Sequence, residues 1–151
     1  VRARGLDRAI HRLVDEGRPL LGICLGMQLL ARTGMEDGRA DGLGFFDASV
    51  ERLPATAPHV PHVGFNSVRF AASAGALSAS LGTAADFYFV HSYRMVCHDS
   101  SDIAGTCEYG EPFAALVRRG RVAGAQFHPE KSQSNGLKLL AAFLSPAFLS
   151  T

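Results

Sequence analysis

The sequence has little cysteine, little lysine and no tryptophan, and it lacks a long hydrophobic run. Its three cysteines are Cys24, Cys97 and Cys107. Three cysteines are too few for a disulfide framework, which indicates a reducing compartment, so we expect a cytoplasmic protein. No apolar segment approaches the roughly 20 residues that a membrane-spanning helix needs, and the first residues do not have the order of a signal peptide. Membrane insertion and secretion are therefore not expected.

The sequence also has no large excess of positive or negative charge. Fifteen Lys and Arg residues face fourteen Asp and Glu residues, which gives a net charge of +1, and the arginines are scattered along the chain. Without a basic cluster, the sequence predicts neither nucleic-acid binding nor a membrane-binding face. The 151 residues, 47% of them hydrophobic, fit a single globular domain over 1–151 with a sizeable core.

A helix, a strand and a second helix are predicted at the start of the chain. Apolar residues recur at helical spacing between positions 6 and 14, which predicts a helix that buries one face, and these residues are Leu6, Ile10, Leu13 and Val14. Gly17 is placed to end this helix. Residues 19–24 form a short apolar run typical of a parallel strand buried on both faces, and 25–32 predict the following helix, which ends near Gly34. This order of elements predicts a layered α/β fold.

Short extended segments dominate the chain from residue 38 onwards. The predicted strands are 48–53, 63–70, 87–97, 103–108, 113–117 and 121–127. Arg118-Arg119-Gly120 joins the last two as a hairpin. A final helix is expected after Pro129, with Ser134 as its cap and an apolar stripe formed by Leu137, Leu140, Phe143 and Leu144.

One cysteine lies where the first predicted strand gives way to a helix. Cys24 stands between Gly22 and Gly26, and glycines two residues before and after a nucleophile allow the close backbone crossing of a strand-to-helix elbow. Because a helix N-terminus favours a thiolate, we expect the reactive form of Cys24 to be enriched near neutral pH. A buried core thiol is the alternative interpretation of this residue.

A second polar motif follows the last predicted strand. In Gln126-Phe127-His128-Pro129-Glu130, the imidazole of His128 can exchange a proton with a thiol, and the carboxylate of Glu130 can orient the ring. Both Cys24 and His128 follow strands, and open α/β sheets bind ligands at the carboxyl ends of their strands. The spacing alone does not show that these two strand ends meet, and a His-x-Glu pair is commonly a surface pair.

Together, the two motifs resemble those of the class I (triad) glutamine amidotransferases. They read Gly22-Ile23-Cys24-Leu25-Gly26-Met27-Gln28 and Gln126-Phe127-His128-Pro129-Glu130. The resemblance implies a flavodoxin-like layered fold, with a central, mostly parallel sheet and additional antiparallel segments. It also implies a Cys24-His128-Glu130 triad that hydrolyses the side-chain amide of glutamine.

The same resemblance assigns further site residues. It implies that the backbone N–H of Leu25 belongs to an oxyanion hole and that Gln28, Ser92 and Tyr93 help to hold the glutamine substrate. No cofactor is implied. The sequence predicts no metal site either, because prolines flank His59 and His62 and because Cys97-His98 and Cys107 lack an evident fourth ligand.

Variants within and around the motifs are similar to the glutaminase subunits of imidazole glycerol phosphate synthase. They are Met27, Lys131, Pro61-His62-Val63-Gly64-Phe65-Asn66 and Tyr88-Phe89-Val90-His91-Ser92-Tyr93. This resemblance implies a (β/α)8-barrel cyclase partner, which receives the ammonia in histidine biosynthesis, with Lys131, His62 and Asn66 on or near the side that faces it. Two alternatives stay open: an amidotransferase subunit of the anthranilate or aminodeoxychorismate type, and a non-catalytic subunit that only binds a partner.

Relative to the proteins that it resembles, the chain begins late. Those proteins carry further strands before the nucleophile strand, together with a Pro-Gly-Val-Gly loop that supplies a second oxyanion donor, whereas here the helix before that strand begins close to Val1. Loss of one such donor typically lowers turnover by about a hundredfold to a thousandfold. We therefore expect 1–151 alone to have weak or no glutaminase activity, whether it is a fragment, the product of a mis-set start or a trimmed chain.

Overall fold

The computed structural model describes residues 5–36 and 38–150. Its helices are α1 (Leu6–Asp15), α2 (Leu25–Leu29), α3 (Gln133–Phe143) and α4 (Pro146–Leu149), with 3-10 helices η2 (Ala72–Ser78), η3 (Ser100–Asp102) and η4 (Pro129–Lys131). Its strands are β1 (Leu20–Ile23), β2 (Thr33–Gly34), β3 (Ala40–Asp41), β4 (Ala48–Arg52), β5 (His62–Phe70), β6 (Ala84–His91), β7 (Tyr93–Cys97), β8 (Ile103–Tyr109), β9 (Glu111–Arg119) and β10 (Val122–Ala125).

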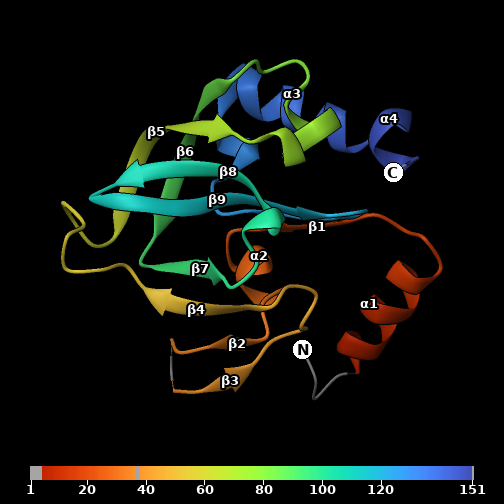
Figure 1. Ribbon diagram of the computed structural model, residues 1–151, viewed down its shortest axis with the longest axis horizontal. Coiled ribbons are helices and arrows are strands. Elements are labelled where there is room, and N and C mark those ends of the chain that lie inside the picture. Colours follow the sequence, from red (N-terminus) through yellow and green to blue (C-terminus); the bar gives the residue numbers. More distant parts are fainter. Residues whose placement is uncertain (1–4, 37, 151) are drawn as a thin grey trace.

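The strands form two sheets in a layered arrangement. One sheet has six strands in the order β1-β10-β9-β8-β5-β6, and the other has four in the order β3-β2-β4-β7. Helices α3 and α4 lie on one side of the six-stranded sheet, and α2 lies between the two sheets (Figure 1). One hydrophobic cluster packs α3 and α4 against the six-stranded sheet through Phe87, Phe127 and Phe143, and a second, around Met27 and Phe46, fills the space beside α2. The predicted layered α/β fold is confirmed.

The central sheet was predicted to be mostly parallel, but most of its strand pairs are antiparallel. In the part of the chain that the structure describes, β1 pairs with β10 in parallel, and every other neighbouring pair of the six-stranded sheet is antiparallel. Short turns account for two of these pairs, since the tight turns between β8 and β9 and between β9 and β10 return the chain in the opposite direction, whereas a parallel pair needs a long crossover. The predicted hairpin between β9 and β10 is confirmed.

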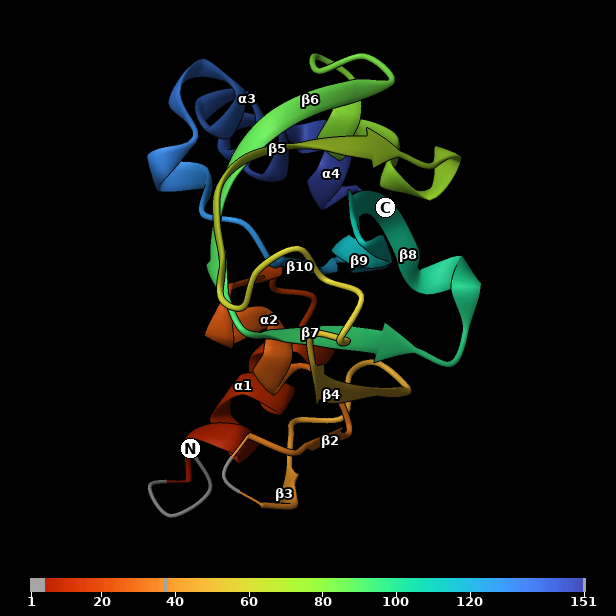
Figure 2. The same ribbon diagram turned by 90° about the vertical axis from the view of Figure 1, so that its left-hand side faces the viewer.

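The predicted single strand over 87–97 is in fact two strands in different sheets. Strand β6 ends at His91 in the six-stranded sheet, and β7 starts at Tyr93 in the four-stranded sheet. The chain crosses between the sheets at Ser92, whose carbonyl accepts a hydrogen bond from the N–H of Leu53 at 2.9 Å. Strands β5 and β6 curve along their length (Figure 2).

Three helix predictions need correction. Helix α1 buries no residue fully, and Leu6 and Leu13 are 48% and 45% exposed, because the helix lies at the side of the molecule (Figure 1). Helix α2 ends at Leu29, and Gly34 belongs to strand β2.

Helix α3 starts at Gln133, so Ser134 lies inside it and does not cap it. Its buried residues are Gly136, Leu139 and Phe143, whereas Leu137 and Leu144 of the predicted stripe are exposed. Gly136 packs directly on the carbonyl of Pro129, and this close approach fixes which face of α3 meets the sheet.

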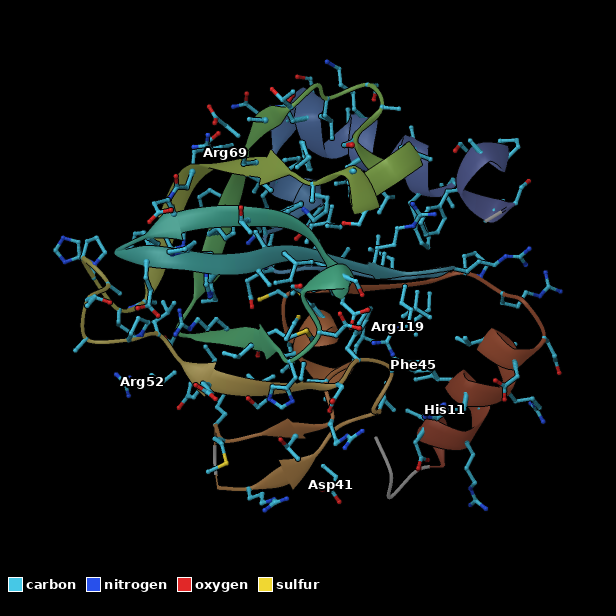
Figure 3. All side chains as sticks on the ribbon, in the orientation of Figure 1. His11, Asp41, Phe45, Arg52, Arg69 and Arg119 are labelled. Atoms are coloured by element: carbon cyan, nitrogen blue, oxygen red, sulfur yellow. The ribbon has the colours of Figure 1, made fainter. Side chains whose placement is uncertain are left out.

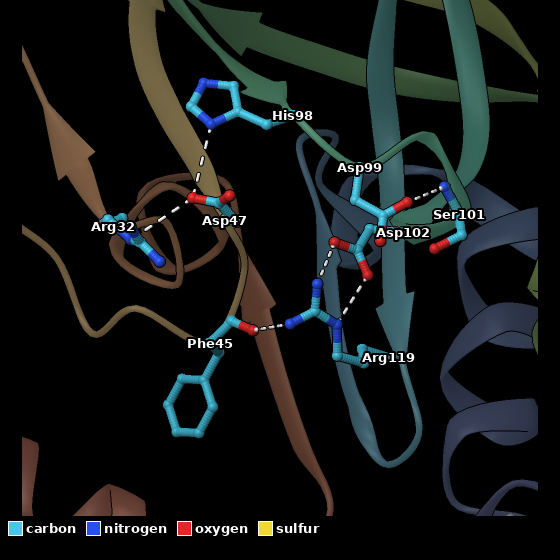
Figure 4. A network of polar contacts seen from close by, with 8 residues as sticks. All are labelled: Arg32, Phe45, Asp47, His98, Asp99, Ser101, Asp102 and Arg119. Atoms are coloured by element: carbon cyan, nitrogen blue, oxygen red, sulfur yellow. Dashed lines mark hydrogen bonds and ion pairs between the residues drawn. The ribbon is translucent and has the colours of Figure 1, made fainter.

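Arg119 joins the two sheets near the end of β9. Its guanidinium donates to both carboxylate oxygens of Asp102, at 2.9 and 2.6 Å, and to the carbonyl of Phe45 at 3.1 Å (Figure 4). His11 of α1 stacks on the ring of Phe45, with the ring centroids 4.4 Å apart, and hydrogen-bonds the carbonyl of Leu43 at 2.9 Å (Figure 3). The loop before β4 therefore connects α1 to both sheets.

Candidate active site

The nucleophile turn is built at the carboxyl end of β1. Cys24 has φ 51° and ψ −109°, a positive φ that is rare for a residue with a side chain, and α2 begins at the next residue. A Cβ on Gly22 would come within 2.5 Å of the carbonyl oxygen of Gly26, so only glycine fits there, whereas a Cβ on Gly26 would meet nothing within 4 Å. The predicted elbow is present, but its tight crossing depends on the first glycine and not on the second.

Strand pairing brings the two sequence motifs together. Strand β1 runs parallel to β10 with Ile23 opposite Ala125, and the N–H of Cys24 donates to the carbonyl of Ala125 at 2.7 Å. His128 follows three residues after Ala125, and its own N–H bonds the carbonyl of Tyr88 at 2.8 Å. The start of α2 and the segment from β10 to α3 consequently lie on the same side of the molecule (Figure 2).

His128 and Glu130 are joined by a short hydrogen bond within this site. Nδ1 of His128 lies 2.6 Å from Oε1 of Glu130, with the histidine side chain 18% exposed and the glutamate side chain 50% exposed. With the Nδ1 proton directed at the carboxylate, Nε2 presents its lone pair. Nε2 is buried and has no hydrogen-bond partner among the described residues. It is therefore available to receive a proton.

The sequence predicted a lower pKa for the thiol of Cys24 than the structure supports. Burial raises the pKa of Cys24 above its ordinary value, the N–H of Leu25 lowers it, and the carboxylate of Glu130 raises it again. The S–H donates to the carbonyl of Val90 at 3.8 Å. The predicted enrichment of the thiolate near neutral pH is wrong, because desolvation of the sulfur outweighs the helix N-terminus.

A cavity of about 200 Å³ opens beside the thiol. It is lined by Cys24, Leu25, Gln28, Glu36, Val90, His91, Ser92 and Tyr93. The predicted oxyanion residue Leu25 and the predicted substrate-binding residues Gln28, Ser92 and Tyr93 thus line the same cavity as Cys24. Glu36 was missed, because a single carboxylate between β2 and β3 carries no local pattern that marks it.

Gln126 belongs to the second sequence motif, but the sequence assigned no role to it. Its side chain is fully buried, and its amide contacts the sulfur of Cys24 at 3.8 Å and the amide of Gln28 at 3.2 Å. Predicting that this polar side chain is buried beside Cys24 would have required knowledge of the strand pairing. The sequence therefore offered no signal for it.

The predicted partner-facing residues fall into two groups. Lys131 is exposed, with its ammonium 6.0 Å from the ring centroid of Tyr88, and Asn66 is half-buried, with its amide donating to the carbonyl of Glu108. His62, however, is only 2% exposed, stacks on Tyr109 and hydrogen-bonds His91 at 3.1 Å. The side chain of His62 is therefore buried in the aromatic core, next to the exposed Val63, and its place near a partner stays a prediction.

Two further observations bear on cofactors and membranes. Among residues 5–36 and 38–150, no three His, Cys, Asp or Glu side chains group closely enough to hold a metal ion. Within the same residues, no helix has the length and apolar character needed to cross a membrane.

Comparison with known proteins identifies the family of the chain. The family model for class I glutamine amidotransferases matches residues 2–146. Solved structures with the same fold include PurLQS from Thermotoga maritima (TM-score 0.70, 16% identity, 92% of this chain and 66% of that one) and a glutamine amidotransferase from the same organism (TM-score 0.63, 18% identity, 94% of this chain and 54% of that one). At such low identity these likenesses show the fold alone.

Curated relatives are more similar in sequence. The imidazole glycerol phosphate synthase subunit HisH of Moorella thermoacetica is 48% identical over 93% of this chain and 66% of its own length, and that of Rhodospirillum rubrum is 43% identical over 93% and 69%. The chain spans about two thirds of the length of these relatives. It belongs to the class I glutamine amidotransferase family and, within it, groups with the HisH subunits of imidazole glycerol phosphate synthase.

Proposed function

We propose that this chain is a glutaminase subunit of an imidazole glycerol phosphate synthase, in which Cys24, His128 and Glu130 release ammonia from the side chain of glutamine. The observation that carries the proposal is the parallel pairing of β1 and β10, which joins the cysteine turn to the strand that leads into the hydrogen-bonded His128–Glu130 pair. Membership of the family and the HisH relatives support the choice of substrate.

The proposed reaction uses each member of the triad in a different way. His128 accepts the thiol proton of Cys24 at Nε2, and the sulfur attacks the carboxamide carbon of glutamine. The imidazolium then protonates the departing nitrogen, which leaves as ammonia, and water hydrolyses the resulting thioester to glutamate and free thiol. Glu130, 2.6 Å from Nδ1, keeps the ring oriented and stabilises its positive charge.

The cavity beside Cys24 provides the groups that a bound glutamine requires. In this proposal, the N–H of Leu25 stabilises the oxyanion, and Gln28 and the Ser92-Tyr93 segment hold the substrate. Glu36 lines the same cavity, and its carboxylate suits the α-ammonium group of an amino acid.

The partner that we propose is a (β/α)8-barrel cyclase subunit. An exposed apolar surface lies on β5 and β6, where Val63 pairs with Val90 and Phe65 pairs with Tyr88. Val63, Phe65 and Val90 are 56%, 52% and 37% exposed, and Lys131 lies beside Tyr88. Large exposed apolar side chains grouped in this way are typical of a protein interface. The carbonyl of Val90 accepts the S–H of Cys24, so this surface borders the proposed site of ammonia release.

The test measures glutamate release from glutamine by the chain mixed with a cyclase subunit, in an assay sensitive enough for the weak turnover expected of 1–151. Cys24→Ala is expected to abolish release, whereas Cys97→Ala, at a thiol outside the cavity, leaves it unchanged. In parallel, a glutamine-mimicking electrophile is expected to label Cys24 in preference to Cys97 and Cys107. Equal labelling of the three thiols would favour a subunit that only binds a partner. Capture by a chorismate-using synthase but not by the cyclase would favour the anthranilate type.

A further inference from the structure

A chain of buried and half-buried polar groups leads from the core of the six-stranded sheet to the nucleophile. Its central group is the carbonyl oxygen of Tyr93, which receives hydrogen bonds from Nδ1 of His91 at 2.7 Å and from Nε2 of Gln28 at 3.1 Å. A carbonyl oxygen can only accept, so both neighbours must present donors to it. His91 therefore carries its proton on Nδ1, and its Nε2 accepts from Nδ1 of His62 at 3.1 Å.

The same argument fixes the orientation of the two glutamine amides. Gln28 directs its NH₂ group at the Tyr93 carbonyl, and this group also lies 3.2 Å from Oε1 of Gln126. Gln126 must accept there, so its own NH₂ group faces the sulfur of Cys24 at 3.8 Å. Because Gln126 is fully buried, turning its amide over would place two oxygens or two NH₂ groups in contact.

We propose that Gln126 is a positioning residue for the nucleophile: held by Gln28, its amide donates an N–H to the sulfur of Cys24 and stabilises the thiolate that attacks the substrate. This inference rests on the proposed function for its consequence in catalysis. Its effect on the sulfur holds whatever the substrate is.

The surroundings of the sulfur show why such a donor matters. Burial and the carboxylates of Glu130 and Glu36 all oppose the negative charge, and the carbonyl of Val90 holds the thiol proton. His91 also lines the cavity, but burial lowers its pKa to about 4, so it is neutral near pH 7 and offers no positive charge. Among the residues that the structure describes, the backbone N–H of Leu25 and the amide of Gln126 donate to the sulfur.

Position separates Gln126 from the substrate-binding residues. It does not line the cavity that holds Gln28, Ser92 and Tyr93, and Gln28 keeps its hydrogen bond to the Tyr93 carbonyl when Gln126 is changed, so the KM for glutamine should stay nearly unchanged. A hydrogen bond to a charged group is strong enough for its loss to lower kcat by about 10- to 100-fold. A lower kcat at constant KM is not expected from a general loosening of the site.

The experiment compares alkylation of the 1–151 chain by iodoacetamide across a pH series, with peptide mass spectrometry as the readout. Gln126→Met keeps the length of the side chain and removes the donor, and it is expected to shift the Cys24 profile about 1 to 2 pH units upward. Gln133→Met, which removes the same amide from an exposed position, leaves the profile unchanged. Cys107 is 1% exposed, so its resistance to alkylation reports that the variant is folded.

An unchanged Cys24 profile in folded Gln126→Met overturns the proposal. If that variant unfolds, the unaltered protein is tested by NMR. The side-chain amide signals of Gln126 must shift as Cys24 is titrated. The same signals must not shift with pH in Cys24→Ser. Signals that stay still in the unaltered protein also overturn it. Neither readout needs glutamine, so failure of the proposed glutaminase activity would be seen separately, as absent glutamate release with an intact alkylation shift.

Discussion

Removal of Arg119 should destabilise the fold more than its half-exposed position suggests. The side chain of Arg119 is 50% exposed, but that of its partner Asp102 is only 3% exposed, and two hydrogen bonds of 2.9 and 2.6 Å join them (Figure 4). Arg119→Met leaves the carboxylate of Asp102 buried without its cation and also removes the bond to the carbonyl of Phe45. The loss of stability in Arg119→Met therefore comes mainly from the buried, unpaired carboxylate of Asp102.

The expected size follows from this asymmetry. Breaking a fully buried ion pair costs about 3 to 5 kcal/mol, and partial exposure of Arg119 places the loss at the lower end, about 3 kcal/mol. This corresponds to a fall in Tm of about 6 to 12 °C. Asp102→Asn leaves a half-exposed guanidinium that water can solvate, so its cost is about 1 to 2 kcal/mol. The double variant should be less destabilised than the sum of both, by about 1 to 2 kcal/mol.

Urea unfolding followed by circular dichroism gives the free energies of unfolding of the unaltered protein, the two single variants and the double variant. Arg69→Met, at an exposed position on β5, is the control and should change stability by less than about 0.5 kcal/mol. Additive effects of the Arg119 and Asp102 substitutions, or a cost for Arg119→Met no larger than that of the control, would refute the reasoning.

Two further predictions concern the nucleophile turn and acid stability. Gly22→Ala should lower the free energy of unfolding by about 3 kcal/mol or more and remove Cys24 labelling, whereas Gly26→Ala should be tolerated, because only the first Cβ meets backbone; equal effects in urea unfolding would contradict this. Burial lowers the pKa of His62 and His91 from 6.5 to about 4, so the unfolded chain takes up protons that the folded chain refuses. Stability should therefore fall by a few kcal/mol as the pH drops from about 6.5 to about 4. His62→Phe should flatten this dependence and exposed His59→Gln should preserve it; an unaltered slope in His62→Phe would contradict the assignment.

Local sequence predicted those elements whose geometry depends on adjacent residues. The turn at Cys24 is readable because Gly22 and the change from apolar strand to helix are neighbours in the chain. The β9–β10 hairpin is readable from Gly120 for the same reason. The single strand predicted over 87–97 failed because a run of β-formers does not show that the chain changes sheets at Ser92.

Predictions that depended on burial succeeded less often. His62 was expected on or near the partner-facing side, but its side chain lies in an aromatic core, and Leu137 was expected in the buried stripe of the last helix but is exposed. The acidity of Cys24 was misjudged because a helix N-terminus is visible in the sequence, whereas desolvation of the sulfur is not.

The sequence alone therefore determined the kinds of chemical group present, the turn that exposes Cys24 and the family resemblance, since these depend on residues close together in the chain. Only the tertiary structure decided that the ends of β1 and β10 meet, that Glu36 joins the cavity and that the amide of Gln126 faces the sulfur. Strand pairing, desolvation and the direction of buried hydrogen bonds are set by segments far apart in sequence, and they exist only once those segments have packed.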